Sequence, residues 1–558
     1  MREGRGFELI TVLGLAVLLI WSRPSAAQNA PSPTTANAVK CNILSDLVPA
    51  ANPADLTTFD STKLATLEPA RKKTLLTSGL PCTDITVDTG PNTPLENRQR
   101  GFDFYSWLTF IALNAPAASP TEIATSRPNT PTVWESADNF IPLLDVMLPG
   151  GARPKWESRV IPPACQKLHA LHPKRMVVKM IEESFNQPFK TGPLIDQRNN
   201  YAIFDILMNK AMFKYIVDNN LYSRAGQMRF ANSGLRIDFP PATLLKNKNG
   251  PDDVGSLMLK VSWKILEPED DKNKFHHVDA LVAMPNTPDE QSDPPCLEKT
   301  LGLVGFHAVH KTENRPQWIW TSFEHIDNVP EQKDVEARKL KRVYNFYDPS
   351  CVNDCPANET PPRPWDPEPE NQLKFRLRHD GKVLFNSQIV RKIPLTEATN
   401  SINAAFHSLF PDNSVWKNYM LIGTQWPSDF TCTQDQALAR NAPAPFTDFD
   451  KQPDMNCAPA PTFLANSTLE TFSQGDIPQA SSSCMACHGN ATSYLRAPRE
   501  VRNPRDAKEA KDAKGATDAK GATDAKGATD AKGAKDAEDR KRAFMNQSDF
   551  TFMLEKAR

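Results

Sequence analysis

The chain has 558 residues, with 65 basic and 66 acidic side chains and a formal net charge of -1 at pH 7. This balance gives no electrostatic reason to expect a nucleic acid or an anionic membrane as partner. The length suffices for one large hydrophobic core or two ordinary ones, and 49 prolines against 23 glycines predict long, rigid loops.

The N-terminus carries the features of an export signal. An apolar run over residues 9–21 follows Arg2 and Arg5, and small residues ending at Ala27 provide a cleavage site. The run is shorter than the ~20 residues that a membrane-spanning helix needs, so an uncleaved anchor is the less favoured alternative. We therefore expect residues 1–27 to be removed, leaving an exported protein without stable membrane insertion.

Residues 28–95 are rich in Pro, Thr, Ala and Asn and predict a partly ordered N-terminal arm, with an amphipathic patch at 64–76. A large domain is expected over residues 96–465. It opens at residues 102–111, whose aromatic and aliphatic density predicts a buried helix that belongs to the core.

Alternating apolar residues indicate a set of strands in the middle of the chain. A helix is expected at 209–217, and strands at 201–207, 256–265, 278–284, 301–309, 317–323, 382–393 and 416–424. The strand at 256–265 is the clearest, and 278–284 is expected to be its neighbour. Clustered strands with helices mostly outside them predict an α+β fold, with a large mixed or antiparallel sheet and peripheral helices.

The segment 466–505 contains Cys484-Met-Ala-Cys487-His488, which is the spacing of covalent c-type haem attachment. The two thiols would form thioethers with the haem vinyl groups, and His488 would be the proximal ligand of the iron. A disulfide or thioredoxin-like Cys-x-x-Cys is the alternative, but it would require a βαβ context that this stretch lacks. Since haem c is attached outside the cytoplasm, the motif and the export signal together predict a periplasmic protein.

Ten cysteines occur, so eight remain outside the motif. An even number in an oxidising compartment indicates disulfides, although some of these cysteines could instead be free and buried. We predict only the sequence-local pairs, Cys351 with Cys355 and Cys432 with Cys457. The other four are Cys41, Cys82, Cys165 and Cys296.

Residues 506–540 consist mainly of a repeat, in which Asp-Ala-Lys-Gly-Ala-Thr occurs three times in succession from Asp512. The segment is charge-balanced and has no aromatic residue, so it is expected to be disordered. The apolar pattern resumes in residues 541–558, which we expect to dock back onto the domain.

With these motifs in view, the chain resembles exported bacterial proteins known as cytochrome c family proteins. The matching segments are 107–114, 193–196, 302–312, 316–328, 421–426, 464–471 and the haem motif. The likeness covers roughly residues 100–495 and the last ten residues, and the inserted repeat departs from it. The resemblance implies a haem c protein and names no substrate.

The residues downstream of His488 are too few to enclose a haem, because domains below ~40 residues seldom fold without help. The upstream domain is therefore expected to cover the haem. The distal ligand is left open among His325, His407, Met420, Met545 and Met553, or a vacant position. We favour His325, because it ends the stretch 318–325, whose aromatic residues could form a wall of the porphyrin site.

A separate metal site could be drawn from His307, His310, Glu324 and His325. If the strand at 301–309 extends to His310, the two histidines at i and i+3 face opposite sides of it, and the adjacent Glu324 and His325 also diverge. One ion could not bind all four, so histidines hydrogen-bonded within a core or cleft are the favoured interpretation.

Two functions are consistent with the sequence. The first is a monohaem electron-transfer cytochrome with a redox partner protein. The second is a haem-dependent periplasmic oxidoreductase with a substrate pocket in the upstream domain. The coordination of the iron discriminates between them, since two protein ligands favour electron transfer and an open distal position favours catalysis.

Overall fold

The computed structural model describes residues 64, 68–76, 81–82, 95–118, 123–188, 191–242, 254–284, 295–312, 315–340, 342–351, 355–361, 387–427, 459–474, 482–489, 491, 493, 548–549 and 551–557. The predicted signal peptide, the repeat, the Cys432–Cys457 pair and Met545 lie outside these residues. Within the described part of the chain, no helix combines the length and apolarity needed to cross a membrane.

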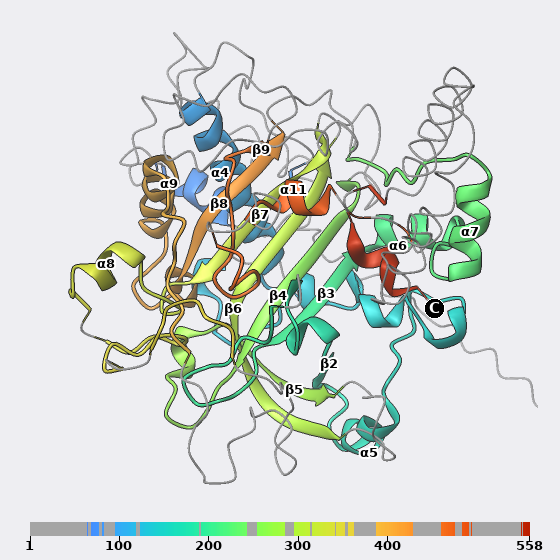
Figure 1. Cartoon of the computed structure of the whole chain (residues 1–558), viewed down its shortest axis with the longest axis horizontal. Helices are drawn as coiled ribbons and strands as arrows, with labels where there is room; N and C mark the ends of the chain where they lie inside the picture. The colour runs from blue at the N-terminus through green and yellow to red at the C-terminus, as the bar shows by residue number, and fades with distance from the viewer. Residues whose placement is uncertain are drawn as a thin grey trace, which may run out of the picture.

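One large sheet organises the fold (Figure 1). Its main path runs, with every neighbour antiparallel, through β1 (Phe140–Pro142), β3 (Ile203–Asn209), β4 (Leu257–Ile265), β6 (Cys296–Thr312), β7 (Arg315–His325), β8 (Tyr419–Pro427) and β9 (Pro459–Ala460). A side branch pairs β5 (His277–Ala283) antiparallel with β6 and parallel with β2 (Met176–Lys179). The predicted α+β class with a mixed sheet is confirmed.

Two strand predictions were wrong. The strand β5 is not a neighbour of β4, because β6 is 17 residues long and pairs with β5 through its first half and with β4 through its second. Of the predicted strand at 382–393, the described residues 387–393 form only an isolated bridge between Arg391 and Glu331. Ile389 is buried there in an apolar cluster that contains strand residues such as Phe204 and loop residues such as Phe346, so its apolar character did not indicate a strand.

One face of the sheet is covered by α4 (Leu95–Asn114) and α9 (Glu397–His407). Trp107 and Phe110 of α4 are fully buried against sheet residues such as Phe306 and Phe323. This agrees with the predicted buried helix. The remaining helices are α3 (Pro69–Leu76), α5 (Pro163–Leu171), α6 (Lys210–Asp218), α7 (Arg224–Asn232), α8 (Gln332–Glu336) and α11 (Cys484–His488).

The opposite face is crossed by residues 459–474, by α11 and by the C-terminal η13 (Phe552–Lys556). Strand alternation separates the two faces, because Ala308 and Ile319 pack with α4 whereas Val309 and Trp320 pack with Met485 of α11. We call these the α4 face and the α11 face.

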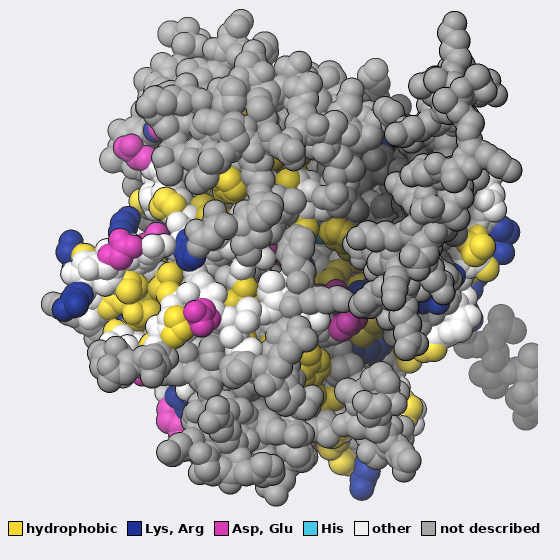
Figure 2. Space-filling view, viewed as in Figure 1, with side chains coloured by type: hydrophobic (Ala, Val, Ile, Leu, Met, Phe, Trp, Pro, Cys, Tyr) yellow, Lys and Arg dark blue, Asp and Glu magenta, His cyan; other side chains and the backbone are white. Residues whose placement is uncertain are grey.

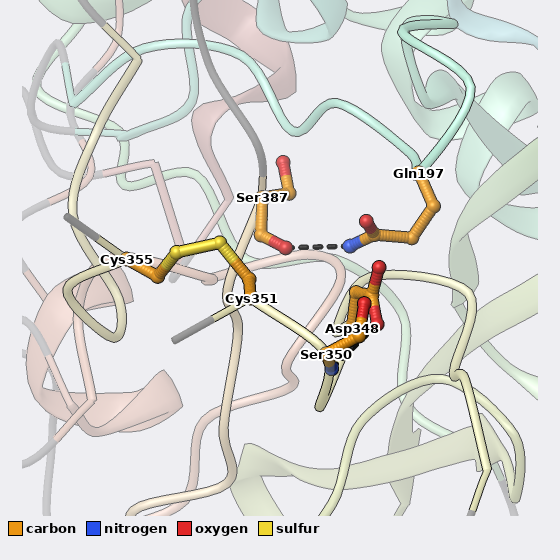
Figure 3. The surroundings of a disulfide bond; sticks show 6 residues. All are labelled: Gln197, Asp348, Ser350, Cys351, Cys355 and Ser387. Atoms are coloured by element: carbon orange, nitrogen blue, oxygen red, sulfur yellow. Dashed lines mark hydrogen bonds between the residues drawn. A yellow bond between two sulfur atoms is a disulfide. The ribbon is translucent and has the colours of Figure 1, made fainter. Parts of the chain in front are cut away.

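Two disulfides link described cysteines. Cys351 and Cys355 form the predicted local pair, with Cα atoms 6.1 Å apart (Figure 3). Cys165 of α5 is joined to Cys296 at the start of β6, with Cα atoms 5.1 Å apart across 131 residues of sequence. This second pair was not predicted, since only the tertiary fold brings α5 to β6. Cys82 is also disulfide-bonded.

Candidate functional site

The short helix α11 presents the Cys-x-x-Cys-His motif on the α11 face, in contact with β7 and β8. Ser483 precedes the helix and accepts a hydrogen bond from the Ala486 amide at 3.3 Å. Gln425 of β8 accepts a hydrogen bond from the Met485 amide at 2.7 Å, and the Met485 side chain is buried. The sheet therefore holds the motif at both its backbone and its central side chain.

Cys484 and Cys487 are the free thiols among the described cysteines. Three residues apart on one helical turn, they lie on the same side of α11. Burial raises the pKa of both thiols, that of Cys487 to about 12, and the nearby carboxylate of Glu470 raises both further. Both sulfurs are therefore protonated thiols at neutral pH, close to Glu470.

The imidazole of His488 lies between aromatic rings from two distant parts of the chain. Its ring centroid is 4.5 Å from that of Trp320 on β7 and 5.1 Å from that of Phe552 in η13. The C-terminal residues thus contribute a wall of the site, although a long stretch of sequence separates them from the motif.

The C-terminal element is itself anchored by buried polar contacts. The carboxylate of Asp549 accepts hydrogen bonds from Lys311 Nζ at 2.6 Å and from the Phe239 amide at 2.8 Å. Gln227 of α7 donates to the carbonyl oxygen of Leu554 at 2.9 Å. These contacts hold Phe552 in place against the His488 ring.

Beside the motif, a polar row crosses the sheet. Lys260 of β4, His307 of β6 and Ser322 of β7 are cross-strand partners and share the α11 face. Glu470 reaches this row from the segment 459–474, with 3.9 Å to Lys260 Nζ and 3.5 Å to His307 Nε2. Burial lowers the pKa of His307 to about 3, so its imidazole is neutral. Burial raises the pKa of Glu470, while Lys260 opposes that rise.

The position of Glu470 follows from hydrogen bonds between its segment and the sheet. Asn466 donates to the Phe323 carbonyl oxygen at 3.0 Å, and the hydroxyls of Thr468 and Ser262 are 2.7 Å apart. Glycine at 305 is required for this approach, because a Cβ there would collide with both hydroxyl oxygens. The chain can cross so close to the strands only where β6 has no side chain.

A buried ion pair lies next to this segment. Glu324 of β7 is fully buried and accepts hydrogen bonds from Arg391 at 2.7 Å and from the Ser467 hydroxyl at 2.6 Å. Arg391 also donates to Glu331 at 2.8 Å. A charged group that is buried away from water needs hydrogen-bonding partners of this kind. Here the partners link β7, the segment around Arg391 and the segment around Ser467.

His325, our favoured distal ligand, lies on the opposite side of the sheet from the motif. Its ring stacks on Phe275 at 4.3 Å, and its neighbour Tyr419 belongs to the core beneath α4. Nδ1 accepts from the Asp327 amide at 3.1 Å, so Nε2 carries the proton and donates to the Lys274 carbonyl oxygen at 2.9 Å. The preference for His325 must therefore be corrected: strand alternation turns it away from α11.

The other candidate ligands among the described residues lie at different places around the sheet. His407 donates from Nε2 to the Tyr419 carbonyl oxygen at 2.7 Å and has an edge contact with Trp107, which places it on the α4 face. Met420 lies five residues along β8 from Gln425, opposite Glu324. Met553 is buried in the same cluster as Met485, so it is the one candidate among these that the fold brings to the motif.

The four residues weighed as a separate metal site diverge as strand alternation predicts. His310 hydrogen-bonds Tyr105 of α4, whereas His307 faces Glu470 on the α11 face. In the described part of the chain, no group of three or more His, Cys, Asp or Glu side chains is arranged to hold a metal ion.

Trp320 belongs to the aromatic stretch 318–325 that was expected to wall a porphyrin, and it contacts His488. Two other contributors to this site could not be recognised from sequence: Lys260 and Glu470. Glu470 lies in the segment 464–471 on which the family resemblance partly rests, but nothing local to it points to the motif. Searches of protein-family models, of curated proteins and of solved structures found no match to this chain.

Proposed function

We propose that the chain is an exported monohaem c-type cytochrome that exchanges electrons with a redox partner protein. One haem would be held by thioether bonds from Cys484 and Cys487, with His488 as the proximal iron ligand. The observation that carries the proposal is a Cys-x-x-Cys-His turn whose thiols are both free, in a chain whose other described cysteines are disulfide-bonded.

The residues around the motif fit such a group. Two free, reduced cysteines on one helical turn could each add the sulfur and hydrogen of their thiol across one vinyl group, and Gln425 and Ser483 orient the turn. Trp320 and Phe552 confine the ring of His488, which fixes the direction of its nitrogen atoms. When bound, haem supplies a one-electron iron couple, and the protein tunes it through ligation, hydrogen bonding and burial.

The same contacts support a haem segment that depends on the large domain rather than folding alone. The motif packs against β7 and β8, and the C-terminal element completes its surroundings. Described Lys, Arg, Asp and Glu side chains are interspersed over the face seen in Figure 2. We expect a redox partner that docks on such a surface to make polar contacts of both charge signs.

The test is covalent retention of haem in the full chain expressed with a haem c maturation system. Wild-type protein should keep haem-peroxidase stain through denaturing electrophoresis, and the double variant Cys484→Ser/Cys487→Ser should lose it. The matched control is Cys351→Ser/Cys355→Ser. It removes two cysteines that are close to each other in the sequence but lie outside the haem motif, and it should keep the stain. Wild-type protein without covalent haem would refute the proposal.

A haem-dependent oxidoreductase is the second candidate, and one observation favours it. The buried His307 and the partly buried Lys260 and Glu470 form a polar cluster close to the thiols, of a kind that could bind or protonate a small substrate. Carbon monoxide separates the two candidates, because it binds ferrous haem that keeps an open position and is excluded when two protein ligands occupy the iron.

A further inference from the structure

His307 combines burial with a ring nitrogen that makes no hydrogen bond to a described residue. Its side chain is 9% exposed, and its Nε2 atom has no hydrogen-bond partner in the described structure. Glu470 is 3.5 Å from that nitrogen, outside hydrogen-bonding geometry. By contrast, both ring nitrogens of His310, on the same strand, are hydrogen-bonded. A buried polar atom without a partner in a folded protein calls for a functional explanation.

The chemistry of this imidazole suits a metal ligand. Burial and the nearby ammonium group of Lys260 keep the ring neutral, which is the form in which histidine binds metals. The neutral ring has one nitrogen with a lone pair, and Nε2 makes no hydrogen bond to a described residue.

The location of His307 matches that of the motif. Ser322 is its cross-strand partner on β7, and Trp320, two residues away on the same face, contacts His488. Glu470, which lies beside His307, also interacts electrostatically with both thiols. His307 and the motif therefore border the same region above the sheet.

We propose that His307 is the second protein ligand of the haem iron, completing with His488 a bis-histidine site. This inference rests on the proposed function. Among the alternatives, His325 and His407 lie on the α4 face with Nε2 atoms donating to carbonyl oxygens. Among the described methionine candidates, Met553 shares the buried cluster of Met485 and is the competing ligand.

Two axial histidines have a functional consequence. An iron with both axial positions filled by protein is closed to small ligands, and it changes oxidation state with little rearrangement. With His307 bound to the iron, the polar cluster would serve to ligate the haem rather than to bind a substrate. This favours electron transfer over catalysis.

The test compares full-length holoprotein variants by absorption and electron paramagnetic resonance spectra, with carbon monoxide as the probe. Wild type is expected to be low-spin and unreactive toward carbon monoxide. His307→Ala should keep covalent haem, lose the low-spin signal and bind carbon monoxide, and added imidazole should restore the low-spin spectrum. His325→Gln, the matched control on the other face, should behave as wild type.

A low-spin spectrum in His307→Ala that excludes carbon monoxide would overturn the inference, as would opening of the iron by Met553→Leu instead. If His307→Ala does not fold, His307→Met replaces it, and a sulfur-to-iron charge-transfer band absent from wild type is the supporting result; its absence overturns the assignment. Wild type without covalent haem refutes the proposed function itself, whereas unchanged coordination with haem attached refutes His307 alone.

Discussion

The two faces of the sheet are built from different kinds of contact. On the α4 face, Trp107 stacks on Phe406 at 5.0 Å and Phe110 on Phe323 at 4.1 Å, within a large aromatic core. On the α11 face, ion pairs and hydroxyl groups are buried between the strands and the segment 459–474. The same strands thus face a large aromatic core on one side. On the other side they face a buried network of ion pairs and hydroxyl groups, next to an apolar cluster that includes Trp320 and Met485.

This difference separates stability from positioning. Burying a large aromatic side chain contributes free energy of folding without requiring exact geometry, whereas a buried ion pair gives little net stability and demands precise partners. We infer that the aromatic core of the α4 face acts mainly through the folding free energy, and that the polar network of the α11 face uses directional contacts to hold Glu470, His307 and the motif.

The largest expected effect of a single substitution is that of Trp107→Ala. The change removes a fully buried ring and its 3.0 Å hydrogen bond to Asn403, and large-to-small core substitutions of this type cost about 3–5 kcal/mol. Urea unfolding measures the loss, and folded variant protein should still carry covalent haem. Trp107→Phe is the milder control. If the folded variant lost its haem, the α4 face would also be needed to hold the motif, contrary to the roles inferred for the two faces.

Arg391→Ala tests the polar layer. It leaves Glu324 fully buried without its cation, which costs about 3–5 kcal/mol in comparable sites. The control is Arg342→Ala, where the guanidinium paired with Asp327 is half exposed and the expected loss is at most about 1 kcal/mol. Similar losses of unfolding free energy for the two variants would contradict the buried network as described.

Gly305→Ala should have an intermediate effect. The added methyl group would displace the hydrogen-bonded Thr468 and Ser262 hydroxyls, and overpacking of this kind costs about 1–3 kcal/mol. Gly302→Ala, on the same strand, meets only the flexible end of Leu266 and should cost less. Because Gly305 sets the position of Glu470, we also expect a changed haem spectrum in Gly305→Ala. If the stability changed but the haem spectrum did not, the position of Glu470 would have no influence on the haem.

A pH dependence of stability is expected from two buried acids of the α4 face, Asp103 and Asp205. Burial raises the pKa of Asp103 to about 6 and that of Asp205 to about 7. The folded protein therefore retains protons that the unfolded chain releases above its pKa near 4, so the unfolding free energy should fall as pH rises from about 4 to 7. Each carboxyl can contribute about 1.4 kcal/mol per pH unit at most.

Asp205→Asn removes one of these protons and should flatten that dependence, measured by urea unfolding at a series of pH values across the same window. Asp103→Asn should do so over a narrower range, since the pKa of Asp103 is raised less. A slope identical to that of wild type in Asp205→Asn would mean that this carboxyl is ionised in the folded protein.

Elements with a strong local pattern could be predicted with boundaries close to those observed. Residues 256–265 alternate and are rich in β-branched and aliphatic side chains, and β4 occupies Leu257–Ile265. The expected helix at 209–217 is observed as α6, Lys210–Asp218, with Asn209 as its cap. The stretch 382–393 misled because burial of a loop residue and burial of a strand residue select the same apolar side chains.

The candidate site also has features that local sequence determines and features that it does not. The motif at Cys484 to His488 carries its chemistry in adjacent residues, so the sequence by itself determined which thiols and which imidazole are presented together. Alternation along a strand also determined that His307 and His310 diverge, as do Glu324 and His325. These are local properties, set by covalent spacing and backbone geometry.

Only the tertiary structure decided which of the two faces carries the motif. That choice places His307, Lys260 and Glu470 beside the thiols, turns His325 away, and joins Cys165 to Cys296. It depends on strand order and on residues 459–474 crossing at Gly305, both of which bring together groups far apart in the chain. No local pattern encodes such distances, because the free energy that selects them comes from the packing of the whole domain.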